Sequence, residues 1–359
     1  MTPFPRSEVK SFFGSLAVAA LLLVGILLLT LLILLVSGAP PFTALKYIFM
    51  GSLGSWQKVA QVLRVWVPLC LCACGLLFSF RIGLWNIGIE GQVVAGAIFA
   101  TAIMRLGTEH GPSSVILFSA FLGGVVGGSL WAIMTGFLKT RAGVNEIFAG
   151  LGLNFVALGI SLWLIFGPWK RPGVASMSGT EPFPPSLWLP VLKSLRLSPV
   201  GLLLALAGVL LTAWMLGRTR LGLALKGIGN NPKAAYLHGL KPGTYIILAM
   251  GIAGAFAGMA GVFQVVGVYH RLIPSISSNY GYLALLVVML ADYRVWPAPV
   301  IAFFFASLNV GSIQLPMMLQ LDSSLSGIIQ GSLVLATLLL QGYRKRRNLL
   351  AHSLSGYNE

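Results

Sequence analysis

The sequence predicts an all-α membrane protein: a polytopic bundle of about ten transmembrane helices with one short cytoplasmic helix. Of its 359 residues, 57% are apolar and only 9% are charged, and the mean hydropathy is +0.89. Average soluble domains are about 45–50% apolar and about 25% charged. So few charged side chains cannot cover a soluble globule, and a disordered chain needs low hydrophobicity. The composition therefore excludes a soluble enzyme and a disordered protein.

Apolar runs between charged residues give the expected spans in order. A helix needs about 20 mostly apolar residues to cross the hydrocarbon of a bilayer. Residues 40–64 mix apolar, aromatic and basic side chains, and we expect them to form an amphipathic segment on the membrane interface. The second span borders a glycine-rich break, and the eighth is short. The expected spans are residues 16–36, 65–80, 90–106, 114–137, 146–168, 198–216, 243–268, 281–293, 296–315 and 323–342.

The positive charges predict the orientation. The net charge of +16 lies in short segments between apolar runs, which indicates contact with membrane lipid and argues against a nucleic-acid partner. With a cytoplasmic N-terminus, most of the 24 Lys and Arg residues fall inside, and the basic run Arg344–Arg347 places the C-terminus there as well. The expected parts are a cytoplasmic N-terminus (1–11), a transmembrane domain (12–342) with a cytoplasmic segment at 217–241, and a basic cytoplasmic tail (343–359).

The densest polar group follows the second apolar run. Asn86, Glu90 and Gln92 stand among the glycines of residues 83–92, which weaken a helix. One interpretation is a broken helix beside a translocation path, because unwound backbone at membrane depth must be buried in protein or line a cavity. The other is an ordinary cytoplasmic hairpin in which Glu90 favours the N-terminal end of the next helix. The residues alone leave both open.

A second polar group begins the fifth span. Asn145 and Glu146 lie where that helix would start, so capping is the simpler interpretation. Asn154 lies deeper and needs a partner in apolar surroundings, which makes it a pore-lining or interhelical hydrogen-bonding candidate. The pattern does not decide between Glu90 and Glu146 as the functional carboxylate. We expect no metal site, because Cys70, Cys72 and Cys74 lie in an apolar run without other ligand-type residues.

The polar segment 217–241 contains signals for a short helix. Asn231 suits an N-cap, Pro232 suits the first helical position, and Gly239 is typical of a helix end. Such a helix, held between two spans, could dock into a groove of another protein. The alternative is a plain basic loop.

Two motif regions resemble a known family. The pattern Gly222…Lys226-Gly-Ile-Gly-Asn-Asn-Pro-Lys-Ala-Ala…His238-Gly-Leu resembles the coupling segment of permease subunits in bacterial ATP-binding-cassette (ABC) importers, in the branch for ribose-type sugars, branched-chain amino acids and nucleosides. Residues 83–92, with Gly143–Ile147 and the Leu153-Asn154 pair, resemble the nucleoside-type members. The likeness covers about residues 12–342, although Arg141 and Val144 depart from the pattern around Asn145 and Glu146.

The resemblance implies a non-enzymatic permease subunit of the bacterial inner membrane that imports a nucleoside-like solute or a simple sugar. Its partners would be ABC ATPase subunits, a second homologous permease in a heterodimer, and an extracellular or periplasmic solute-binding protein. The chain has no G-x-x-x-x-G-K-[ST] motif, so a partner would bind the ATP and this chain no cofactor. The implied substrate-path residues are Asn86, Glu90, Gln92, Asn145 and Asn154, and the implied ATPase-coupling residues are Gly229, Asn230, Pro232, Ala234, Ala235 and Gly239.

Two alternatives remain open. An ion-coupled secondary transporter of a small polar solute needs titratable groups in the membrane, and Glu90 is the only strong candidate. A membrane-embedded enzyme is less favoured, because the four histidines have no paired-ligand spacing. An ATPase partner would support the importer, and cation-driven uptake by the isolated chain would support the carrier.

Overall fold

The computed structural model describes residues 40–107, 111–173, 179–192 and 194–319, with isolated helical positions at 28, 32, 35, 327, 328, 331, 332, 335 and 342. The predicted first and tenth spans therefore lie largely outside the described residues. In the described part, the chain is helical and contains one isolated β-bridge, between Leu192 and Leu197. The predicted all-α class is confirmed.

Seven of the described helices are long and apolar enough to cross a membrane. They reproduce the predicted third to seventh and ninth spans closely and lengthen the second. They are α3 (Trp56–Arg81), α4 (Ile89–Gly107), α5 (Ser113–Ala142), α6 (Glu146–Phe166), α7 (Pro199–Arg218), α10 with the π-helix η2 (Pro242–Phe263 and Gln264–Tyr269), and α12 with α13 (Pro297–Ser312 and Gln314–Leu319).

The shorter elements connect these helices. They are α2 (Pro41–Leu53), the 3-10 helix η1 (Pro185–Leu187), α8 (Arg220–Asn230), α9 (Pro232–Leu237) and α11 (Tyr280–Leu290). The predicted eighth span corresponds to α11, whose 11 residues extend only about 17 Å at 1.5 Å per residue. It is too short to cross about 30 Å of hydrocarbon alone. A total of ten spans is thus not confirmed by the described residues.

The predicted amphipathic segment 40–64 is wrong as a single element. The chain breaks at Gly54 and Ser55, and residues from Trp56 onward belong to α3. Lys58 and Arg64 are compatible with this helix because a long aliphatic stem allows the charged end to reach a polar region.

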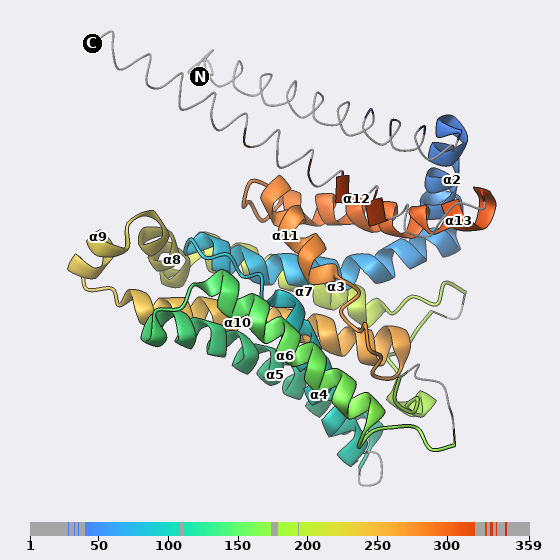
Figure 1. The fold of residues 1–359 in the computed structure, drawn as a ribbon, viewed down its shortest axis with the longest axis horizontal. Helices are drawn as coiled ribbons and strands as arrows, with labels where there is room; N and C mark the ends of the chain where they lie inside the picture. The colour runs from blue at the N-terminus through green and yellow to red at the C-terminus, as the bar shows by residue number, and fades with distance from the viewer. Residues whose placement is uncertain are drawn as a thin grey trace, which may run out of the picture. The chain divides into compact units, whose positions relative to one another are not determined.

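The chain forms two compact units, residues 1–55 with 307–359 and residues 56–306. In the described part of the first unit, α2 packs against α13 through Ala44, Ile48 and Leu315. The second unit contains the helices α3 to α11 and the first part of α12, and α4, α5 and α10 are its most closely associated helices (Figure 1).

Glycines allow α5 and α10 to touch along their backbones. A Cβ atom added to Gly128 would meet the Gly254 carbonyl oxygen within 3.0 Å, and one on Gly258 would meet that of Gly124. Gly96 of α4 meets the same Gly258 backbone. Such close approach is how membrane helices gain packing where lipid supplies no hydrophobic drive. These glycines therefore pack α5, α10 and α4 tightly against one another.

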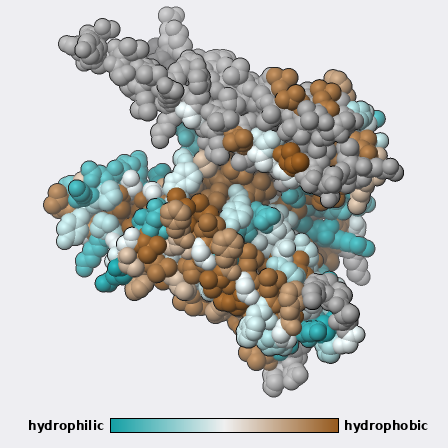
Figure 2. Space-filling view, viewed as in Figure 1, coloured by the Kyte–Doolittle hydropathy of each residue, from teal (hydrophilic) through white to brown (hydrophobic). Residues whose placement is uncertain are grey.

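The outer surface of this unit follows its composition. Figure 2 shows hydrophobic residues over the middle of the helices and hydrophilic residues toward their ends, including the end that carries α8 and α9. On α6, Phe148, Phe155 and Trp163 are all more than half exposed. Apolar side chains exposed along a helix of this length suit a lipid environment.

Candidate functional site

The helix breaks between α3 and α4. Residues 82–88, which we call the broken segment, connect Arg81 at the end of α3 to Ile89 at the start of α4. Gly83 has a φ of +83°, a left-handed conformation that glycine adopts without steric cost. Both interpretations of this glycine-rich stretch require the helix to end here, as it does, and its freed backbone groups need other partners.

Two amide side chains close the broken segment onto the first turn of α4. The Asn86 amide nitrogen donates to Gln92 Oε1 at 3.1 Å, and the Gln92 amide nitrogen donates to Asn86 Oδ1 at 2.8 Å. Neither residue exposes any surface. A side-chain amide offers both a donor and an acceptor, so the two groups match each other. Asn86 and Gln92 hold the segment together and present no open polar face.

Asn154 ties the broken segment to α6. Its Oδ1 accepts the Gly91 N–H at 2.8 Å, and its amide nitrogen donates to the Ile87 carbonyl at 2.9 Å and to the Tyr282 hydroxyl at 3.1 Å. It is 1% exposed. Asn154 thus forms interhelical hydrogen bonds, which provide the partners that a polar side chain needs inside an apolar helix.

Glu90 connects α4 to α11. Its carboxylate accepts the Tyr282 N–H at 3.1 Å, and it also takes hydrogen bonds from the Ser277 hydroxyl and the Gly281 N–H. The residue is 4% exposed. A negative group is favourable at a helix N-terminus, where N–H groups lack intrahelical partners. Glu90 lies in the first turn of α4, but its carboxylate bonds to the first turn of α11, a partner 192 residues away.

Asn145 and Glu146 lie at the turn between α5 and α6. Asn145 is exposed and caps α6 by accepting the Ile147 N–H at 2.8 Å. Glu146 forms an ion pair with Lys139 of α5, and its carboxylate also accepts the Trp85 N–H of the broken segment. Glu146 therefore binds the broken segment from α6, whereas Glu90 connects α4 to α11.

The accessible side chains around the broken segment are aromatic. Trp85 is 40% exposed and Tyr282 is 37% exposed. The Phe80 ring lies 5.4 Å from the Trp85 ring and 5.1 Å from the Tyr293 ring. The sequence interpretation did not assign a role to Trp85, although it stands inside the polar glycine-rich stretch. Tyr282 lies in an apolar run, and no local signal marks it.

The segment 217–241 is a helical hairpin. The predicted short helix is confirmed as α9, with Asn231 as N-cap accepting the Ala234 N–H at 3.1 Å and Pro232 at the first position. Gly239 takes a φ of +85° after the helix ends. The preceding residues form a second helix, α8, whose N-cap Thr219 accepts the Gly222 N–H.

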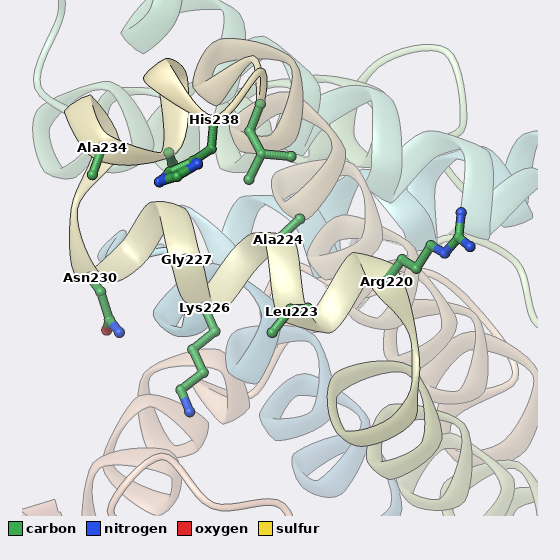
Figure 3. Close-up of a pocket in the computed structure, with 10 residues that line it drawn as sticks. Arg220, Leu223, Ala224, Lys226, Gly227, Asn230, Ala234 and His238 are labelled. Carbon is green, nitrogen blue, oxygen red and sulfur yellow. The ribbon is translucent and has the colours of Figure 1, made fainter.

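A groove of about 560 Å³ separates α8 from α9. Figure 3 shows Ala224 and His238 between the two helices and Lys226 pointing away from α9. Ala235 is buried in this groove, whereas Tyr236 and Leu237 are 67% and 85% exposed. Of the other predicted coupling residues, Asn230 and Ala234 line the groove, and Gly229 lies against the end of α3. The exposed residues of α9 are therefore Pro232, Lys233, Tyr236 and Leu237, and the last two are large and apolar or aromatic.

No cluster of three or more metal-ligating side chains occurs within the residues that the structure describes. Cys70, Cys72 and Cys74 are buried as free thiols in α3.

Comparison with known proteins identifies related sequences over most of the chain. The family described as branched-chain amino acid transport system / permease component matches residues 58–338. A glucose ABC transporter permease protein of Haloferax volcanii is 29% identical over 325 residues, which is 88% of this chain and 85% of that protein. A guanosine ABC transporter permease protein of Bacillus subtilis is 26% identical, covering 85% and 87% of the two chains. A nucleoside ABC transporter permease protein of Lactococcus lactis is 26% identical, covering 79% and 80%. Second permease proteins with the same substrate names from the last two organisms are also similar, at 27% and 25% identity.

Proposed function

The chain belongs to the branched-chain amino acid transport system / permease component family, and on that premise we propose that it imports a nucleoside-like solute or a simple sugar. Members of this family are transport subunits and not enzymes, and the seven apolar helices fit a multi-pass membrane protein. The substrate class rests on the relatives, which are named for guanosine, nucleosides and glucose. Family membership also disfavours the ion-coupled carrier and the membrane-embedded enzyme.

The energy for import comes from partner subunits in this proposal. ABC ATPase subunits bind and hydrolyse ATP, and a solute-binding protein delivers the solute on the opposite face. A heterodimer with a second homologous permease is supported by the relatives, because Bacillus subtilis has two guanosine permease proteins and Lactococcus lactis has two nucleoside permease proteins that resemble this chain. In this proposal the transmembrane domain, residues 12–342, lies in the bacterial cell (inner) membrane. Both terminal segments, residues 1–11 and 343–359, lie in the cytoplasm.

We place the solute path beside the broken segment. The observation that carries this is an interrupted backbone between two apolar helices, held by side chains from α6 and α11, with aromatic side chains exposed next to it. Asn86, Glu90, Gln92 and Asn154 fix the shape of the segment, and Asn145 fixes the adjoining turn. Their bonding capacity is largely used internally, so they act as supports for the path.

Trp85 and Tyr282 are the side chains that the proposal places against the solute. A planar indole can stack on a nucleobase or on the apolar face of a sugar ring, and base–aromatic stacking is worth about 1–3 kcal/mol. The Tyr282 hydroxyl accepts from Asn154 and keeps its own proton to donate to a solute hydroxyl or ring nitrogen.

Uptake in proteoliposomes tests the proposal. The permease, its ATPase partners and the binding protein would be supplied with labelled nucleosides, ribose and glucose, with and without ATP. Trp85→Ala should raise the solute concentration for half-maximal uptake by about tenfold, the loss of one stacking contact. Phe155→Ala is the matched control, because Phe155 is an exposed aromatic on the outer face of α6. Unchanged uptake by Trp85→Ala would show that the solute path does not pass this segment. Uptake that is driven by a cation and does not need ATP would instead support the secondary transporter.

The hairpin α8–α9 is the proposed ATPase-docking element, with Gly229, Asn230, Pro232, Ala234, Ala235 and Gly239 shaping it. Because Ala235 is already enclosed by α8, the contact with the ATPase falls to Leu237 and Tyr236. Leu237→Ala should reduce the amount of ATPase that co-purifies. Leu203→Ala, an equally apolar exposed site on α7, is the control. Equal ATPase recovery from both variants would contradict the docking role of the α8–α9 hairpin.

A further inference from the structure

The last turn of α8 lies directly against the backbone where α3 ends. A Cβ atom added to Gly229 would meet the Arg81 carbonyl oxygen within 3.0 Å and would lie 3.2 Å from the Ile82 carbonyl carbon. From the other side, a Cβ on Gly83 would lie 3.8 Å from the Gly229 carbonyl oxygen. The hairpin therefore touches the beginning of the broken segment backbone to backbone, with no side chain between them.

Such a contact transmits displacement well. A flexible side chain can change rotamer and absorb a small movement, whereas two close-packed backbones move together. The hairpin itself is firmly joined at Asn231: its side chain caps α9, and its N–H donates to the Gly227 carbonyl of α8 at 3.1 Å. A push on α9 is thus carried along α8 to residues 81–83.

The broken segment continues the connection on its far side. Its end at Gly88 packs against Gly150 of α6, and the following Glu90 holds the first turn of α11 through the Tyr282 N–H. Residues 82–90 therefore lie between the hairpin on one side and α6 and α11 on the other. Contacts therefore run without a gap from Gly229 to the aromatic side chains that we place beside the solute, and a movement of Gly229 can reach them.

We propose that Gly229 is the positioning residue through which the α8–α9 hairpin moves the broken segment. The inference rests on the proposed function, in which the ATPase partners displace α9 when they bind ATP. Gly229 touches neither the ATPase nor the solute; its lack of a side chain sets the distance between α8 and the end of α3.

The decisive comparison is Gly229→Ala against Gly227→Ala. Both glycines lie in α8 two residues apart, so both changes add the same methyl group and the same helix propensity. A Cβ at Gly227 meets nothing within 4 Å. In the complete complex, Gly229→Ala should still co-purify with the ATPase subunits. It should lose stimulation of ATP hydrolysis by the solute-loaded binding protein, with uptake reduced about tenfold, within the usual range of coupling between sites. Gly227→Ala should behave like the parent.

A labelling measurement reports the movement itself. In a background where Cys70, Cys72 and Cys74 are replaced by alanine, Trp85→Cys places one thiol on the broken segment, to be labelled by a small maleimide. ATP should change the labelling rate when Gly229 is present and leave it unchanged in Gly229→Ala. A merely structural role of Gly229 would not remove the ATP dependence while preserving assembly.

Three results would contradict the inference. Equal stimulation and uptake in the two glycine variants would show that the contact is only packing. Loss of ATPase assembly in Gly229→Ala would make Gly229 part of hairpin formation. An ATP-dependent labelling rate retained in Gly229→Ala would show that the movement takes another route. Absence of ATP-driven uptake by the parent complex would instead contradict the proposed function, so the two failures are distinguishable.

Discussion

The crossing of α5 with α10 and the broken segment 82–88 both depend on glycine, for different reasons. At the crossing, Gly128 and Gly258 remain helical, and the missing side chains let two backbones touch. In the broken segment, Gly83 takes a left-handed φ and the helix stops. The crossing therefore needs empty space, whereas the segment needs side chains that bond the backbone groups freed by the helix break. Asn154 supplies such bonds to the Gly91 N–H and the Ile87 carbonyl.

The largest expected effect is at the crossing. Gly258→Ala would push a methyl group into the Gly124 carbonyl and close to the Gly128 backbone, neither of which can rotate away. Overpacking of this kind costs about 3 kcal/mol or prevents folding. Thermal unfolding in detergent, followed by thiol labelling of the buried Cys70, measures the loss. Gly152→Ala, in open space on α6, should be neutral or slightly stabilising. Equal stability of the two variants would show that the crossing of α5 with α10 does not depend on the missing side chain at Gly258.

The next effect tests whether the broken segment depends on hydrogen bonds. Asn154→Leu keeps the size of the side chain but leaves the Gly91 N–H and the Ile87 carbonyl without their partner. We expect a loss of about 2–3 kcal/mol, because each stranded buried group costs about 1–3 kcal/mol. Ser161→Ala in the same helix removes a buried hydroxyl that has no hydrogen-bond partner, and should cost much less. The same labelling assay compares them, and an Asn154→Leu variant as stable as Ser161→Ala would show that the bonds contribute little.

A double-mutant cycle on Asn86 and Gln92 sharpens the same point. Asn86→Leu or Gln92→Leu alone leaves a buried amide unsatisfied, at a cost of about 1–3 kcal/mol each. The double variant removes both amides and should cost less than the sum of the single changes. Asn86→Leu should also reduce uptake while ATPase assembly persists. Strictly additive costs would mean that the pair does not act as a unit.

The smallest effect lies at the end of α10, beyond its glycine contacts. His270 follows the π-helix, stacks on Trp188 with ring centroids 3.9 Å apart, and burial lowers the pKa of its imidazole below the usual 6.5. The unfolded chain then binds a proton first as the pH falls through about 6.5, so acidification should destabilise the fold until the lowered pKa is passed.

The control for this pH effect is His270→Asn, because asparagine tolerates the positive φ of 56° at this position and does not titrate. The difference in unfolding midpoint between about pH 8 and about pH 5.5 should be smaller in the variant than in the parent. A parent and variant with the same pH dependence would show that His270 does not contribute to it.

The membrane spans could be read from the sequence because charged or polar residues separate the apolar runs. The bounds of α4 to α7 follow that pattern, and the cap signals at Asn231, Pro232 and Gly239 located α9. These are local signals, each contained within one helix or its ends. No helix was predicted for residues 220–230, which contain three glycines. The Thr219 cap and packing stabilise α8 there.

The partners within the candidate site were beyond such local reading. In one of the two interpretations Glu90 acted at the N-terminal end of its own helix, but its carboxylate bonds to the first turn of α11. The Gly229 contact likewise joins residues that are well separated along the chain. The sequence also predicted one continuous helix over 243–268 and did not indicate the π-helix at Gln264–Tyr269. Which distant groups satisfy a buried polar atom is decided by three-dimensional packing, and no spacing rule in one sequence encodes it.

The Asn86–Gln92 pair has an electrical consequence. The two amides satisfy each other without any formal charge, so carrying them through the field across the membrane requires no electrical work. A moving unit charge would exchange about 2.3 kcal/mol for each 100 mV. If the uncharged broken segment supplies the moving part and Glu90 stays with α11, import at a fixed ATP concentration should run equally fast in polarised and depolarised vesicles.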